Sequence, residues 1–504
     1  MKKCMGLILF GLLIVAFSAP VYAQFEWKVS GYLDTNYFYY RNIYKTAQIT
    51  GGYVDMTRPT GNTMGDTRSI DKTGSYFNTR GRFKFDAAMG KDVTGTMFFE
   101  MDSARWGETQ GGVNQSGKWV ADQPDVEVKN LYLDFAIPYF GIPVPMTARV
   151  GIQPLVVAPE MAITTDGPGI TLGFKADPVT ISPFWFKASQ SKEYASTDAD
   201  VFGAQLIAKV STLTVGAYGV LYDMRTYPLA SVTYTSVDPS FKGKMWWFGG
   251  YAQGMMGPLN MKADFVMDKG SVKSFGATST YEDVKYQGWA TRLRLSYPIE
   301  MFEIGAQGMY ATGSDLQKTS GTGLPGSTVG NTAAGGGQSY KVGSYVIPPG
   351  SEANTGFGVN SSGFFYGGNP LTSRTPDFTG SNGNSMSRGA LGGTWFAQAF
   401  ASYKVAPWYK ITALGAYIGD TTKNGNTIGT ATKKGTNTPR DDNFIGWELG
   451  LFNEIQIYKN LTWGTVFSYM IAGDALDIRG LGVPGDNVSP ADPYMIGTIL
   501  KYTW

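Results

Sequence analysis

Charged side chains alternate with apolar ones in several short segments, and these charges are the residues through which the chain could do chemistry. The cations at issue are Arg80, Arg82, Lys84, Arg149, Arg292 and Arg294. Glu160 and Asp166 lie in the connection 157–168, which follows the segment that holds Arg149. Fixed cations that face carboxylates across a narrow passage create a transverse electric field, which orients dipolar solutes and discriminates between ions. We therefore expect these residues to form a charged constriction, with 157–168 folded inward against a basic wall. The alternative is that they are ordinary charges scattered along a wide passage.

The remaining sequence offers little for catalysis. It contains no His and a single Cys, Cys4, which excludes His-dependent triads, His-ligated zinc and axial-His haem. The stretch 321–326 matches G-x-G-x-x-G, but Pro325 and the surrounding glycines supply neither the buried strand nor the helix start that a nucleotide loop needs. The Asp and Asn residues of the loops lack the spacing of a calcium site. The sequence predicts a non-enzyme with no catalytic residue, no cofactor and no metal site.

The first 23 residues have the organisation of an export signal. Lys2 and Lys3 precede a 13-residue apolar stretch, 5–17, and small residues lead up to Ala23. Cleavage after Ala23 is therefore expected, and Cys4 would leave with the signal. Without Lys2 and Lys3 the basic residues fall from 42 to 40, against 40 acidic residues. A mature chain without net charge argues against nucleic acid as a partner.

The elements that must position the charges are strands. Eighteen segments alternate with period 2, so apolar side chains lie on one face and charges on the other. Most segments have the roughly 9–11 residues that a tilted strand needs to cross a membrane. The connections between them are alternately short and long, which is typical of a barrel with short periplasmic turns and long external loops. The predicted fold class is an all-β transmembrane antiparallel barrel of about 18 strands, with 16 as the alternative, spanning a single domain, 24–504.

The longest connection, 312–393, contains 20 Gly in 82 residues and is expected to be an external loop. Its effect on the passage is left open. The C-terminus forms a last alternating strand in which Leu500, Tyr502 and Trp504 fall on one face. This pattern resembles the signal that the barrel-assembly machinery recognises. An ordinary amphipathic last strand is the alternative interpretation.

Four stretches carry a family resemblance. The segments 79–107 (TRGRFKFDAAMGKDVTGTMFFEMDSARWG), 125–138 (DVEVKNLYLDFAIP), 148–154 (ARVGIQP) and 167–189 resemble the outer-membrane homotrimeric porin family. The resemblance covers roughly the first 200 residues. It implies a trimer of water-filled barrels in the outer membrane of a Gram-negative bacterium, which admits small hydrophilic solutes.

The expected width of the barrel points to the same function independently of the family resemblance. A barrel of 16–18 strands is too wide for its own side chains to fill, so a water channel remains. We therefore expect passive diffusion of ions and small polar solutes, with inward charges such as Arg292 and Glu448 solvated. One alternative is a substrate-specific channel with an aromatic track, and the other is a barrel that serves as scaffold for a secreted partner. The aromatic residues on inward positions are Tyr32, Phe38, Tyr132, Tyr218 and Phe400.

Overall fold

The structure is a computed structural model of the chain. It describes residues 25–42, 73–103, 106–107, 126–138, 144–158, 161–190, 198–225, 227–228, 237–238, 241–274, 284–317, 341–351, 365–366, 391–479 and 485–504. The expected cleavage site after Ala23 lies outside these residues, and so does Glu160.

Eighteen long strands dominate the described chain. They are β1 (Phe25–Arg41), β2 (Thr73–Met89), β3 (Val93–Ser103), β4 (Val126–Ile137), β5 (Met146–Val157), β6 (Ile163–Ala176), β7 (Val179–Ser189), β8 (Ala199–Val210), β9 (Leu213–Met224), β12 (Phe241–Met256), β13 (Leu259–Ser274), β15 (Trp289–Ile299), β16 (Phe302–Ala311), β18 (Thr394–Ala406), β19 (Tyr409–Asp420), β20 (Phe444–Tyr458), β21 (Leu461–Ala472) and β24 (Tyr494–Thr503). The shorter elements are β10 (Tyr227–Pro228), β11 (Val237–Asp238), β14 (Val284–Tyr286), β17 (Lys341–Val342), β22 (Ile478–Arg479), β23 (Asn487–Val488) and the 3-10 turn η2 (Asp474–Leu476). Within the described ranges, no helix is long and apolar enough to cross a membrane.

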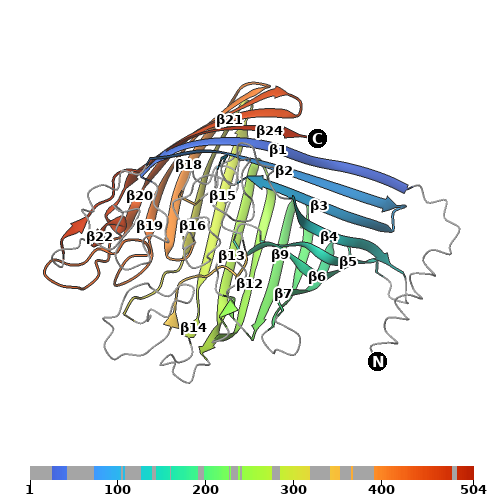
Figure 1. Cartoon of the computed structure of the whole chain (residues 1–504), viewed down its shortest axis with the longest axis horizontal. Coiled ribbons are helices and arrows are strands. Elements are labelled where there is room, and N and C mark those ends of the chain that lie inside the picture. The colour runs from blue at the N-terminus through green and yellow to red at the C-terminus, as the bar shows by residue number, and fades with distance from the viewer. Residues whose placement is uncertain are drawn as a thin grey trace.

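The sheet closes on itself between its first and last strands. β1 pairs with β2 along one edge and with β24 along the other, where Arg41 lies opposite Tyr494 and Tyr32 opposite Thr503. Figure 1 shows β24 beside β1. Every long strand is antiparallel to both of its neighbours in this ring. The predicted fold class, a closed antiparallel barrel of about 18 strands, is confirmed.

The two ends of the barrel differ in their connections. Tight turns join the strands at one end, where positive φ values at residues such as Gly90 (63°) and Gly257 (60°) allow the chain to reverse within two or three residues. Longer connections join the strands at the other end, among them 421–443 and 473–493. The predicted alternation of short and long connections is confirmed.

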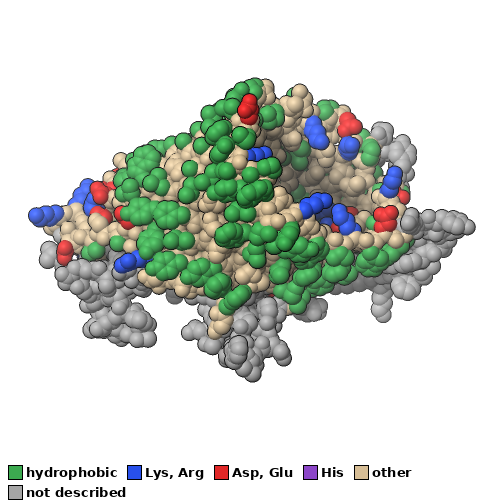
Figure 2. Space-filling view, turned by 90° about the horizontal axis from the view of Figure 1, so that it is seen from above, with side chains coloured by type: hydrophobic (Ala, Val, Ile, Leu, Met, Phe, Trp, Pro, Cys, Tyr) green, Lys and Arg blue, Asp and Glu red, His purple; other side chains and the backbone are tan. Residues whose placement is uncertain are grey.

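The outer face of the barrel is apolar. In β1 the side chains of Trp27 and Leu33 are 60% and 46% exposed, whereas the intervening face carries buried Asp34 and Asn36. Hydrophobic side chains cover much of the outer surface on the side seen in Figure 2. A surface of this kind is unfavourable in water, but a closed barrel keeps all its ladder hydrogen bonds satisfied within lipid.

The interior is divided into two sectors. Inward apolar side chains, most of them on β7–β21 and others on β1, β5, β6 and β24, form a continuous cluster, which also takes in short segments of the long connections. The largest fully buried side chains are Phe38, Met161, Trp247, Tyr286, Tyr345, Phe365, Tyr366 and Phe396. Charged side chains collect on the inner face of β2–β6 instead.

Segment 341–351 folds into the barrel rather than away from it. The indole Nε1 of Trp247 donates to the carbonyl of Val346 (2.8 Å), and the amide of Val346 donates to the carboxylate of Asp268 (3.0 Å). The hydroxyl of Ser351 donates to the carbonyl of Ala162 (2.8 Å). The connection 312–393, predicted as an external loop, therefore narrows the lumen with at least this part.

Candidate functional site: a charged wall of the lumen

Glu100 is the centre of the charged wall. Its carboxylate lies 3.3 Å from Nη2 of Arg80, 2.6 Å from Nε of Arg82 and 3.5 Å from Nζ of Lys129. The register of β2 and β3 accounts for this, because Arg82 stands directly opposite Glu100. Like charges at this spacing would repel strongly, and the shared carboxylate offsets that repulsion.

A β-bulge brings Lys129 into the group. Phe98 pairs with Asn130 and Phe99 with Val128, so Lys129 has no partner in the ladder. Its Nζ lies 2.9 Å from Asp166, which also accepts a hydrogen bond from the side-chain amide of Asn130 (2.6 Å). The wall therefore continues from β2 through β3 and β4 to β6.

A second charged group lies beside the first. Arg149 on β5 makes two hydrogen bonds to Asp134 on β4, at 2.7 and 3.0 Å, and its guanidinium lies 4.5 Å from the ring centroid of Tyr132. The side chains of Arg149 and Asp134 are 35% and 38% exposed, so water reaches them. Lys84 pairs with Asp86 at 3.0 Å. Cations and carboxylates therefore alternate along this wall.

Arg292 does not belong to this wall. It is 2% exposed, and its Nε donates to the carboxylate of Asp264 at 3.0 Å. Glu448 is fully buried as well. The prediction that these charges are solvated is wrong, because aromatic and aliphatic side chains fill this part of the lumen. Arg294 lies at the edge of the filled sector, with its guanidinium 5.0 Å from the ring centroid of Phe400.

The connection 157–168, predicted to be an acidic loop, is partly a strand. β6 begins at Ile163, so Asp166 is part of a strand and of the wall itself, rather than of a loop that opposes it. Met161 and Ala162, which directly precede β6, lie against segment 341–351. Burial raises the pKa of Tyr345 well above its ordinary value, so its phenol stays protonated and donates to the carbonyl of Met161.

The inward aromatic residues fall into two groups. Phe38, Tyr218 and Phe400 are buried in the apolar cluster, which is a packing role. Tyr32 borders the charged wall, with Arg82 at 5.7 Å and Lys501 at 4.6 Å from its ring centroid. A continuous aromatic track along the lumen is therefore not formed by these residues.

Sequence reasoning missed Glu100 and Lys129 as members of the site. Alternation places Glu100 on the inward face of its segment, but only the strand pairing shows that three cations meet it. Nothing in the sequence marks the bulge that brings in Lys129. Among the described residues, no group of three or more His, Cys, Asp or Glu side chains could hold a metal ion.

No family model matches the sequence, and no curated protein matches it. Solved structures of Pseudomonas aeruginosa proteins resemble the chain over nearly its whole length. OpdQ has 9% identity and a TM-score of 0.48, and the match covers 95% of this chain and 98% of that one. OccK8 (OprE) has 10% identity and a TM-score of 0.46, with the same two coverages.

Proposed function

We propose that the chain forms a channel through which ions and small hydrophilic solutes diffuse passively across an outer membrane. The observation that carries this proposal is the charged wall, whose ion pairs lie inside a closed barrel and still reach water. Side-chain exposures of 23% for Arg82 and Lys129, 28% for Asp166 and 35% for Arg149 support an aqueous passage beside β2–β6. Figure 2 shows a hollow in the molecule with Lys, Arg, Asp and Glu side chains around it.

The packed sector limits what can pass. Segment 341–351, together with Met161 and Ala162, occupies space that a barrel of this width would otherwise leave to water. The passage is thus confined to the side of the charged wall. This arrangement favours small polar solutes and makes the wall the element that sets ion selectivity.

The proposal includes the assembly of the protein. The chain is exported to the outer membrane of a Gram-negative bacterium, with its signal removed after Ala23. The barrel-assembly machinery recognises the last strand through Leu500, Tyr502 and Trp504, and three copies associate. Light scattering in mild detergent tests the trimer, and intact-mass analysis tests the cleavage site.

Conductance across a planar bilayer tests the function. The purified barrel should produce discrete current steps, and a salt gradient should give a reversal potential that reports its selectivity. A properly folded, membrane-inserted barrel that carries no current would contradict the proposal. Such a result would favour a scaffold for a partner protein instead.

A further inference from the structure

The first strand extends past the point where the barrel closes. β1 begins at Phe25, but its ladder with β24 begins only at Tyr32, next to two backbone bonds between Gly31 and Trp504. Residues 25–30 therefore pair with β2 on one side and with no described residue on the other. Figure 1 shows β1 running on past the end of β24. We call this stretch of β1, residues 25–30, the β1 edge.

The alternation of the backbone shows which groups of the β1 edge are unpaired. The N–H and the C=O of Gly31 both bond to Trp504, so they point away from β2. Successive residues of an antiparallel strand direct these groups to opposite sides, so the groups of Phe25, Trp27 and Val29 point away from β2 as well. The β1 edge thus presents three N–H and three C=O groups in one row. Such a row is a template for pairing with another strand.

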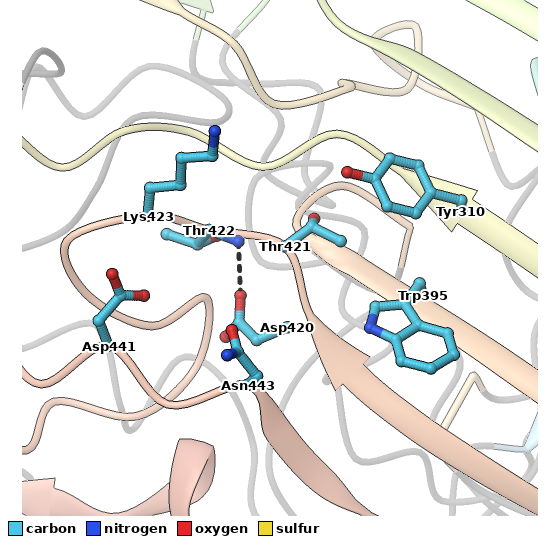
Figure 3. A pocket seen from close by; sticks show the side chains of 8 residues that line it. All are labelled: Tyr310, Trp395, Asp420, Thr421, Thr422, Lys423, Asp441 and Asn443. Atoms are coloured by element: carbon cyan, nitrogen blue, oxygen red, sulfur yellow. Dashed lines mark hydrogen bonds between the residues drawn. The ribbon is translucent and has the colours of Figure 1, made fainter.

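The end of β19 shows how backbone groups are satisfied where another strand leaves the sheet. The amide of Asp420 donates to the carbonyl of Asn443 at 2.9 Å. The amide of Thr421 donates to the carbonyl of Gly393, also at 2.9 Å. The carboxylate of Asp420 accepts the amide of Thr422 at 2.8 Å, as Figure 3 shows. The chain itself supplies these partners, whereas the row on the β1 edge has none among the described residues.

The outer face of the β1 edge is apolar although it lies beyond the lipid. The side chains of Phe25, Trp27 and Val29 are 54%, 60% and 49% exposed. At the end of β24 the rings of Tyr502 and Trp504 lie 5.6 Å apart, and aromatic residues at barrel ends mark the boundary of the lipid tails. Unpaired backbone groups are costly in lipid, so the β1 edge lies in water beyond this boundary. An exposed apolar strip in water marks a surface that a partner covers.

The charges of the β1 edge specify the sequence of a strand that fits it. Glu26 and Lys28 alternate with the apolar residues, and both are exposed. Opposite charges that face each other across an antiparallel pair stabilise it, and like charges destabilise it. The fitting strand has a basic residue opposite Glu26, an acidic residue opposite Lys28 and apolar residues at the positions between and beside them. From its N-terminus it reads apolar, acidic, apolar, basic, apolar.

We propose that the β1 edge binds an extended segment of a separate periplasmic polypeptide, which adds to the sheet as a further strand. The periplasmic location rests on the proposed function, in which the end of the barrel with the tight turns faces the periplasm. The pairing itself rests on the β1 edge alone. A second copy of the chain in the same membrane does not fit, because antiparallel pairing at this edge would invert its barrel.

Binding of short peptides to the purified full-length barrel in detergent tests the proposal. The first probe has the sequence of residues 25–30, Phe-Glu-Trp-Lys-Val-Ser. In antiparallel pairing its Lys lies opposite Glu26 and its Glu opposite Lys28. The second probe has Glu and Lys exchanged, so like charges meet while the composition stays the same. Fluorescence anisotropy of labelled peptides should show about fivefold weaker binding of the second probe, the effect of two exposed cross-strand pairs.

Methylation of single peptide amides separates strand pairing from side-chain contact. In the first probe the amide of Trp faces the β1 edge, and N-methylation there should weaken binding about tenfold. The amide of Lys faces away, and N-methylation there should leave binding unchanged. In the barrel, Val29→Pro removes one N–H of the row and keeps the ladder with β2, because Pro is tolerated where the N–H faces away from the sheet. It should weaken binding about tenfold as well, whereas the matched control Val29→Ala should not.

A barrel with exchanged charges keeps the test decisive if Val29→Pro does not fold. The double variant Glu26→Lys with Lys28→Glu should bind the second probe more tightly than the first. Absence of binding by both probes, equal affinity for them, or equal effects of the two N-methyl groups would overturn the proposal. Self-association of the barrel in light scattering that Val29→Pro abolishes would overturn it too, because the partner would then be a second copy. Peptide binding requires no current, so conductance of the same preparation reports separately on the channel proposal.

Discussion

At the scale of single residues, the charged wall depends on one carboxylate. Replacing Glu100 with Gln removes the negative charge that Arg80, Arg82 and Lys129 share, so the wall gains net positive charge. A unit charge about 4 Å from a passing ion contributes about 1 kcal/mol in water, which is roughly fivefold in local ion concentration. We expect the anion-to-cation permeability ratio, measured from the reversal potential at low salt, to rise by about that factor.

Two controls accompany this prediction: a measurement at high salt concentration and the removal of a charge elsewhere in the barrel. The shift should shrink at 1 M salt, where the screening length falls to about 3 Å. Glu26→Gln removes a charge from an exposed position near the end of β1 and should change the ratio far less. An equal shift in both variants would mean that Glu100 has no special place in the passage.

Neutralising Arg82 should change the ion selectivity of the barrel, whereas neutralising Arg292 should lower its stability. Arg82→Gln removes a water-accessible cation and should move selectivity towards cations. Arg292→Gln leaves Asp264 charged and buried, a situation that typically costs about 3–5 kcal/mol of stability. We expect a marked fall in the temperature at which the barrel unfolds in gel-shift assays for Arg292→Gln, and little change for Arg82→Gln. Recovery of the unfolding temperature in the double variant Arg292→Met with Asp264→Leu would confirm that the pair is structural, and a continued fall would contradict it.

These residues also show that period-2 alternation predicts which face of a strand a side chain lies on, but not whether water reaches it. The inward face of each strand was predictable from period 2, because side chains of a strand point alternately to its two sides. Arg80, Arg82 and Lys84 were expected on the inner face for this reason, and in the structure they pair with Glu100 and Asp86. Whether an inward residue meets water depends on what fills the lumen opposite it, and that was not readable for Arg292. The sequence holds no sign that Trp247 and segment 341–351 would close over this side.

At the scale of elements, the central question is what holds segment 341–351 inside the barrel. Asp268 on β13 accepts the amide of Val346 at 3.0 Å and the amide of Gly288 at 2.9 Å. Asp268→Asn can accept only one of them, and an unpaired buried amide costs about 1–3 kcal/mol. We expect the segment to detach more often, so the mean single-channel conductance should rise and larger polyethylene glycols should enter. The matched substitution Asp223→Asn, at an exposed position near the end of β9, should leave both quantities unchanged.

Strand positions were the most predictable level of the fold. All eighteen alternating segments correspond to long strands, since the membrane imposes the same length and pattern on each. The first and last residues of the strands were predicted less accurately. The predicted connection 157–168 includes 163–168, which the structure shows to be the first half of β6. Gly167, Pro168 and Gly169 broke the alternation there, although the backbone continues in the ladder with β5.

At the scale of the whole molecule, closure joins the two ends of the chain. β24 pairs with β21 and with β1, and the terminal Trp504 exchanges two backbone hydrogen bonds with Gly31 at 3.2 Å. Its ring lies 5.1 Å from that of Phe83. The first and last long strands thus meet at a seam that only the complete barrel can form. An unclosed seam would expose backbone groups to lipid, where each unpaired group is costly.

Shortening the last strand should therefore damage assembly more than removing a side chain from it. Deleting Tyr502, Thr503 and Trp504 removes both the ladder next to Tyr32 and the bonds to Gly31, and we expect membrane-inserted, heat-modifiable protein to fall to a small fraction of its normal amount. Trp504→Ala keeps the backbone bonds and should assemble at an intermediate level if the aromatic side chain is also read as a signal. Refolding of purified protein into detergent separates the two effects, because no assembly machinery is present there. Trp504→Ala should refold normally in detergent, whereas the truncated chain should not. Normal amounts of the truncated chain in the membrane would show that neither barrel closure nor recognition by the assembly machinery depends on these residues.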